Sequence, residues 1–198
     1  MFSQDLLTFL KVKRLRLPLL DLRDKAVLAA NLCFLYHTMK ASEHLLHVGV
    51  LTSVDVNLRD YYTKHLEEEE GHADWLLRDL TEGGVDSSTI PRQSMQMAGV
   101  QYYLMFHVNP ASLLGYMAAL ECFPAPMELI EQLEALHGKP LLRTMRYHSE
   151  HDPKHAKDLL AFIDLRPQRD YAAIMEAAEQ AIQCLTLASQ QMEVAHAE

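Results

Sequence analysis

The sequence is poor in the residues that break helices and in those that cross-link a chain. Only 7 of its 198 residues are glycine, 8 are proline and 3 are cysteine. The cysteines stand far apart at positions 33, 122 and 184, without the paired spacing of a zinc knuckle or the density of a disulfide scaffold. We therefore expect free thiols in a reducing cytoplasm and a chain built mainly of helices.

An excess of basic charge and long apolar runs are also missing. The formal net charge is −9 at pH 7, whereas surfaces that bind nucleic acid are usually basic. No stretch approaches the roughly 18 apolar residues that cross a bilayer, and the start lacks the pattern of a signal peptide. We therefore expect a soluble protein that binds neither nucleic acid nor membrane.

Helical spacing of apolar residues dominates the chain, and no alternating run predicts a strand. The length suits one domain with a sizeable core. Proline- and glycine-containing breaks divide the pattern. We expect a single all-α domain over residues 1–198, a bundle of about six or seven helices. The expected segments are a leading helix within 1–20, then 21–51, 55–80 and 92–108, a helix at 111–122 that continues after a break as 127–136, then 140–163 and 169–193, with a frayed tail at 194–198.

The segment 147–155 packs three histidines and two carboxylates into nine residues. In a helix, His148, Asp152 and His155 recur at i, i+4 and i+7, so their side chains leave one face. Pro153 can kink the helix between them. His151 falls at a different angle, and we expect it behind the ligands or on the surface. This face is a candidate metal-binding face.

Four consecutive glutamates at 67–70 precede a second candidate motif. Such a run is usually a solvated helix face, but it spans more than one turn, so part of it should point inward with His72. Either Glu68 or Glu69 would then lie beside this imidazole. Helical bundles use the Glu-x-x-His spacing to hold two metal ions. Mixed carboxylate and imidazole donors suit iron or manganese.

Glu121 is the third candidate, because it stands in a stretch otherwise free of charge. A buried carboxylate is costly unless it is paired or bound to a metal. A salt bridge to Arg143 or Arg146 is the alternative explanation. Together, the three motifs predict two sets of metal ligands. The first set has one carboxylate and two imidazoles: Glu69, His72 and His148. The second set, for a neighbouring metal, has two carboxylates and one imidazole: Glu121, Asp152 and His155.

The three motifs in this order resemble the haem-oxygenase-like di-iron oxidases and oxygenases. The matching pieces are 65–72 with the following Trp75, 115–121, and the His-x3-Asp-x2-His pattern, within about residues 25–165. The resemblance implies the helical fold shared with haem oxygenase and the thiaminase-like proteins. It also implies two irons (manganese being an alternative) held by the six residues, dioxygen as cosubstrate and an external electron donor. Members oxidise small amines, amino acids or fatty acids by N-oxygenation, desaturation or C–C cleavage, which suggests a biosynthetic role.

The resemblance leaves one ligand position open. Some relatives place a carboxylate further upstream, where this chain has His65. Glu68 or His65 are therefore alternatives to Glu69, and Glu43 is an additional ligand candidate, as in some relatives.

Aromatic residues of the methionine-rich helix at 92–108 are expected to line the pocket for a small-molecule substrate: Tyr102, Tyr103 and Phe106. A bundle with this many apolar stripes is also expected to form a homodimer.

Three other functions compete with the oxidase hypothesis. A haem-binding monooxygenase would need an axial imidazole such as His37 or His44, and would leave the acidic motifs unexplained. An iron-free hydrolase or oxidase would need a nucleophile such as Cys122, which has only Glu121 beside it. A non-catalytic helical protein could use the same donors to sequester metal.

Overall fold

The computed structural model describes residues 1–194 of the chain, and the regular elements in this part are all helical, as expected. The expected frayed tail lies outside the described residues, apart from Val194, which ends the last helix. The elements are α1 (Phe2–Arg14), α2 (Lys25–Thr52), α3 (Val56–Glu69), α4 (His72–Glu82), α5 (Arg92–His107), η1 (Pro110–Ser112), α6 (Leu113–Glu121), α7 (Met127–His137), η2 (Lys139–Leu142), α8 (Arg143–Asp164), η3 (Gln168–Asp170) and α9 (Tyr171–Val194).

Aspartate caps set the starts of two of the long helices. The carboxylate of Asp24 accepts hydrogen bonds from the amides of Ala26 and Val27 at the start of α2. Asp55 does the same for the first turn of α3. Such caps satisfy amide groups that have no partner within the helix. The sequence signals therefore placed these helix starts to within a few residues.

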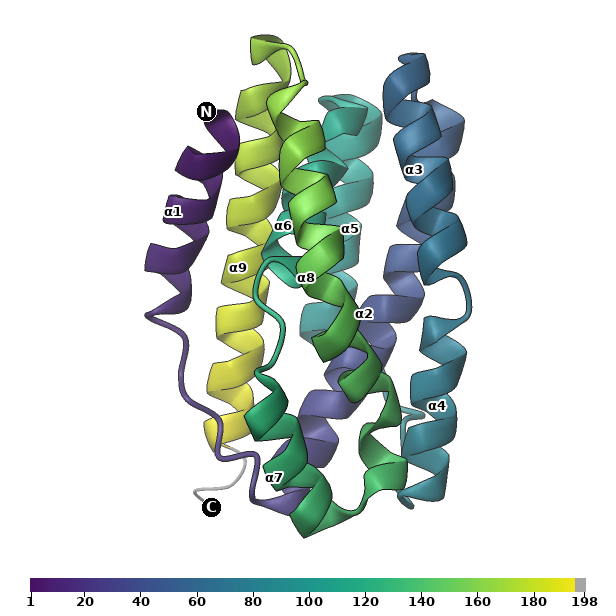
Figure 1. Cartoon of the computed structure of the whole chain (residues 1–198), viewed down its shortest axis with the longest axis vertical. Helices are drawn as coiled ribbons and strands as arrows, with labels where there is room; N and C mark the ends of the chain where they lie inside the picture. The colour runs from purple at the N-terminus through teal and green to yellow at the C-terminus, as the bar shows by residue number, and fades with distance from the viewer. Residues whose placement is uncertain (195–198) are drawn as a thin grey trace.

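The bundle is built around α6, the shortest of its α-helices among the described residues. Every residue from Leu113 to Ala119 is buried, and α6 packs against α9 and α8. In Figure 1, α6 lies in the middle of the bundle, behind α8 and beside α9, while α1 lies along the outer side of α9. The helix that ends at Glu121 is therefore enclosed by the core.

A glycine allows α6 and α9 to approach closely. A Cβ atom on Gly115 would lie 1.8 Å from the backbone oxygen of Ile174 and 3.0 Å from the backbone nitrogen of Ala178. These obstacles are backbone atoms, so they cannot move aside as a side-chain end can. The crossing of the two helices therefore requires glycine at this position.

The expected single helix over 55–80 is wrong, because the chain breaks between α3 and α4. Gly71 has a φ of +92°, which glycine adopts without steric cost. One carboxylate oxygen of Glu43, on α2, lies 3.2 Å from the amide nitrogens of both Gly71 and Ala73 and accepts hydrogen bonds from them. A side chain distant in sequence thus caps α4, which no local pattern could show.

Two expectations from composition concern the thiols and the membrane. The three cysteines at positions 33, 122 and 184 are free, in agreement with the sequence prediction. None of the helices within residues 1–194 combines the length and the apolar composition that a membrane span requires.

We predict that Gly115→Ala lowers the free energy of unfolding by about 3 kcal/mol or more, because the new methyl group forces α6 and α9 apart. Urea denaturation measures the loss. Gly99→Ala is the matched control: Gly99 is exposed within α5, and an added Cβ meets nothing within 4 Å. This control should stabilise the protein by about 0.5–1 kcal/mol. Equal effects of the two substitutions would contradict the close crossing.

We also predict that Glu43→Ala destabilises the protein by about 1 kcal/mol, because α4 loses its cap. The measurement is made in excess chelator, so that loss of a metal ligand cannot contribute. Amide exchange at residues 71–73 should become faster. His44→Ala, at the exposed neighbouring position, is the control. A Glu43→Ala variant with unchanged stability in chelator would show that capping is not the role of this residue.

Candidate metal centre

The six predicted ligands come from four helices and meet inside the bundle. Three of them stand at helix ends: Glu69 is the last residue of α3, His72 the first of α4 and Glu121 the last of α6. The other three share the inward face of α8, which continues through Pro153 without a break. The carboxylates and imidazoles thus lie inside an apolar bundle, at the ends of α3, α4 and α6 and along the middle of α8.

The structure brings the first predicted set together. Donor atoms of Glu69, His72 and His148 all lie within 4.8 Å of one another. Glu69 Oε2 lies 3.1 Å from His72 Nδ1, and the rings of His72 and His148 are nearly perpendicular, with centroids 5.1 Å apart. Glu69 and His72 therefore meet across the break at Gly71 and do not lie on one continuous helix as expected.

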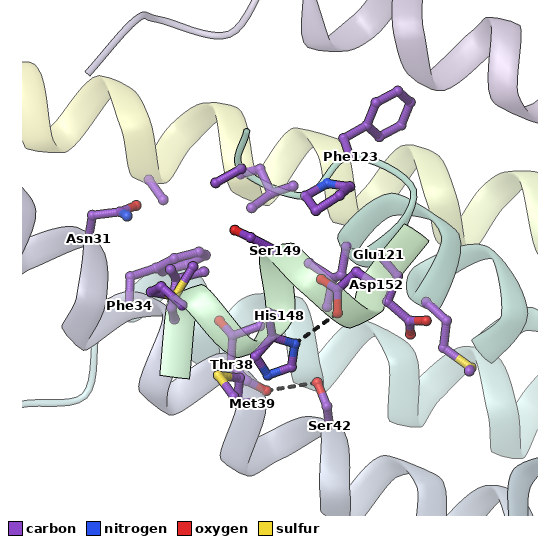
Figure 2. A pocket seen from close by; sticks show the side chains of 18 of the residues that line it. Asn31, Phe34, Thr38, Met39, Ser42, Glu121, Phe123, His148, Ser149 and Asp152 are labelled. Atoms are coloured by element: carbon purple, nitrogen blue, oxygen red, sulfur yellow. Dashed lines mark hydrogen bonds and ion pairs between the residues drawn. The ribbon is translucent and has the colours of Figure 1, made fainter. Parts of the chain in front are cut away.

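The second predicted set does not form such a group within the described part of the chain. Its members contact other members of the cluster instead. Asp152 Oδ1 lies 2.9 Å from His148 Nδ1, and Glu121 Oε1 lies 3.1 Å from His65 Nε2. A dashed line in Figure 2 marks the contact between His148 and Asp152. His155 Nδ1 lies 3.4 Å from the second oxygen of Glu69. Asp152 and His155 are thus joined to the first set, and the ring of His65, 5.8 Å from that of His155, brings Glu121 beside them.

Three buried donor atoms of this cluster have no hydrogen-bond partner: Glu121 Oε2, His148 Nε2 and His155 Nδ1. The approach of His155 to Glu69 has the distance of an ion pair without the geometry of a hydrogen bond. Buried polar atoms are rarely left unpaired, because each such atom costs free energy. Metal ions would satisfy these atoms, and the mixture of oxygen and nitrogen donors suits iron or manganese. The residues therefore fit a metal centre.

Imidazoles balance the charge of the carboxylates in the metal-free protein. Burial works against ionisation of Glu69, but its interactions with His155 and His72 outweigh this and hold its pKa well below the usual range. Burial raises the pKa of Glu121, and His65 only partly offsets this. Burial likewise opposes the charge of His148, yet Asp152 raises the pKa of this imidazole. In the metal-free protein, protons on the imidazoles thus supply positive charge that metal ions would supply when bound.

The three less certain ligand candidates occupy different places. His65 is buried and faces Glu121, so its imidazole belongs to the cluster. Glu68 lies at the edge, with 31% of its side chain exposed and Lys64 Nζ at 3.6 Å. One oxygen of Glu43 is occupied by the amides that begin α4. Glu67 and Glu70 are exposed, so the acidic run divides between solvent and cluster as its length predicts.

The alternative partners proposed for Glu121 are engaged elsewhere. Arg143 pairs with Asp79 and Glu82, and Arg146 makes a two-pronged pair with Glu134. A salt bridge between Glu121 and either arginine is therefore the wrong explanation for this carboxylate.

Three other histidines considered from the sequence lie outside the cluster. His37 Nε2 contacts the carbonyl oxygen of Ser87 at 3.0 Å, and His44 is exposed. Neither is placed as an axial ligand in this cavity. His151 is exposed and contacts the carbonyl oxygen of Tyr147, which agrees with one of its two expected positions.

A cavity of about 550 Å³ opens beside the cluster. The expected pocket residues are wrong: Tyr103 and Phe106 are 62% and 59% exposed on the outer face of α5, and Tyr102 packs against the core. The helix instead buries Met97, Met105 and other residues of its opposite face. Figure 2 shows walls supplied by α2, α6 and α8. Apolar residues of these walls include Phe34, Met39 and Met117, and Phe123 lines the cavity from the segment between α6 and α7. In sequence, these apolar residues are indistinguishable from core residues.

The comparisons with known proteins identify a fold. No family model matches the chain, and neither does any curated protein. Among solved structures, the chain is similar to a domain of unknown function with a haem oxygenase-like fold from Shewanella denitrificans OS217. The TM-score is 0.75 and the identity 18%, over 98% of this chain and 90% of that chain. The protein is thus an all-helical chain with a haem-oxygenase-like fold.

Proposed function

We propose that the protein is a non-haem di-iron oxidoreductase that uses dioxygen to oxidise a small organic substrate. The observation that carries this proposal is the set of unpartnered donor atoms on Glu121, His148 and His155, inside a cluster that borders a mostly apolar cavity. Structural salt-bridge networks rarely leave three buried atoms of one cluster without a hydrogen-bond partner. The fold is consistent with such an activity and does not by itself specify it.

Each metal would be held by one of the predicted sets. Glu69, His72 and His148 would hold the first, and Glu121, Asp152 and His155 the second. The two oxygens of Glu69 already face imidazoles of both sets, at 3.1 Å from His72 and 3.4 Å from His155. This carboxylate would therefore be available to a metal held by either set. Manganese is the alternative metal for the same donors.

When bound, two reduced irons would supply electrons to dioxygen, and an external donor would restore them. The chain contributes binding, orientation and exclusion of water. The cavity walls beside the cluster are mostly apolar, and electrostatic interactions next to such walls are stronger than in open water. His65 Nε2, 3.1 Å from Glu121 Oε1, is placed to hold a proton at that carboxylate.

The competing hydrolase hypothesis is weakened by the state of its thiol. Burial, together with the charge of Glu121, raises the pKa of Cys122 to about 12. The thiolate is the nucleophilic form of cysteine, so this side chain is inert near neutral pH. The cavity therefore lacks an activated cysteine in the part of the chain that the structure describes.

Anaerobic titration of the chelator-treated protein with ferrous iron tests the proposal. We expect saturation at two irons per chain, followed by dioxygen consumption and a transient visible absorption band when oxygen is admitted. Retention of two irons without oxygen consumption, with reductant and panels of amines, amino acids and fatty acids, would instead indicate metal sequestration. A sharp Soret band in protein purified from cells supplied with haem would indicate a haem protein.

We predict that Asp152→Ala removes one iron per chain and abolishes oxygen consumption while leaving the helical content nearly unchanged. Asp152 is buried, and its removal takes away a carboxylate of the second set. His151→Ala is the matched control on the same helix, because His151 is exposed. Metal analysis, oxygen electrode traces and circular dichroism give the three measurements. Unchanged iron content in Asp152→Ala would refute the ligand assignment.

A further inference from the structure

One cation stands in the wall of the cavity. Arg14, the last residue of α1, is the single lysine or arginine among the described residues that line it. The carboxylates and imidazoles in the wall belong to the metal cluster or to the cap of α4. No carboxylate of the described chain lies within ion-pair distance of Arg14, whereas five of the other nine arginines have such a partner. The cavity therefore has a cationic group separate from its anionic cluster.

The contacts of Arg14 hold its side chain in place without neutralising it. The guanidinium lies over the ring of Phe123, 4.9 Å from the centroid, and Nη1 reaches the carbonyl oxygen of Ala119 at 3.5 Å. A guanidinium has five N–H donors, so most remain without a partner from the protein. The side chain is half-buried, and burial lowers its pKa, although arginine stays charged at physiological pH. An anion in the cavity would satisfy both the charge and the donors.

Apart from Arg14 and the cluster, most of the side chains that line the cavity are apolar. The ring of Phe123 packs against the guanidinium of Arg14. Figure 2 shows Phe123 on the other side of the pocket from His148 and Asp152. The walls are mostly apolar and come from α2, α6, α7, α9 and the segment 17–22; among them are Phe34, Met117, Leu129, Leu185 and Met192. At about 550 Å³ the cavity lies within the range of roughly 300–1,000 Å³ typical of small-molecule sites. The occupant should thus have an apolar body.

We infer that the substrate is an amphipathic carboxylate, whose carboxylate pairs with Arg14 and whose apolar body extends toward the metal ligands. The orientation rests on the proposed function, because it is the metal cluster that makes the far end the reacting end. Planar guanidinium groups bind carboxylates through two parallel hydrogen bonds, so Arg14 fixes both the headgroup and the direction of the molecule. An amine headgroup has no anionic partner at this end of the cavity.

Binding of three probes that share one apolar chain tests this inference. Decanoate, decanol and decylamine are titrated calorimetrically into metal-free protein and into anaerobic, iron-loaded protein. We expect decanoate to bind at least tenfold more tightly than the other two in both forms. Arg14→Gln should reduce decanoate affinity at least tenfold and leave decanol affinity unchanged, which also shows that the cavity is intact. Arg14→Lys, which keeps the charge and loses the planar fork, should fall between wild type and Arg14→Gln.

Arg16→Gln is the control, because Arg16 is exposed nearby and does not line the cavity. Equal affinities for the three probes would overturn the inference. So would decanoate binding that requires iron and ignores Arg14, since the carboxylate would then bind the metal. Failure of the protein to bind iron, with decanoate binding still dependent on Arg14, would refute the proposed function and leave the carboxylate site standing.

Discussion

Charge balance between buried carboxylates and imidazoles is the constraint on which this fold depends. Glu69 lies between His72 and His155, Asp152 lies beside His148, and Glu121 lies beside His65. A single unpaired charge in an apolar interior costs several kcal/mol. Each helix must therefore place its carboxylate or imidazole directly beside the partner on the neighbouring helix. Helices α3, α4, α6 and α8 are therefore positioned relative to one another by the cluster as well as by apolar packing. The same requirement explains why so many ionisable groups are tolerated within one core.

Helix ends provide much of this precision. A side chain at the end of a helix can turn toward the bundle axis without a neighbouring turn standing in its way, and Glu69, His72 and Glu121 all use such positions. The left-handed backbone of Gly71 and the distant cap from Glu43 bring the first two together. The close crossing at Gly115 holds α6, and with it Glu121, against α9. Backbone features remote from any donor thus determine where the donors meet.

The all-α fold and most helix boundaries followed from sequence, because apolar periodicity, aspartate caps and prolines act locally. Glu121 was identifiable because it is the lone charge in an apolar stretch, and the donors of α8 because their spacing repeats with the helix. The break before His72 was not predictable, since the group that caps it comes from another helix. Nor was the cavity, because a side chain that lines a void and one that fills a core have the same sequence pattern. The place of His65 in the cluster likewise became apparent only from its contact with Glu121.

The crossing at Gly115 also has a consequence for the order of events as the chain is synthesised. All six predicted ligands precede Ala156, whereas α9, on which α6 rests, begins at Tyr171. A nascent chain that has exposed every one of these donors still lacks the surface that fixes Glu121. The cluster therefore cannot be complete until α9 has also emerged from the ribosome and docked against α6.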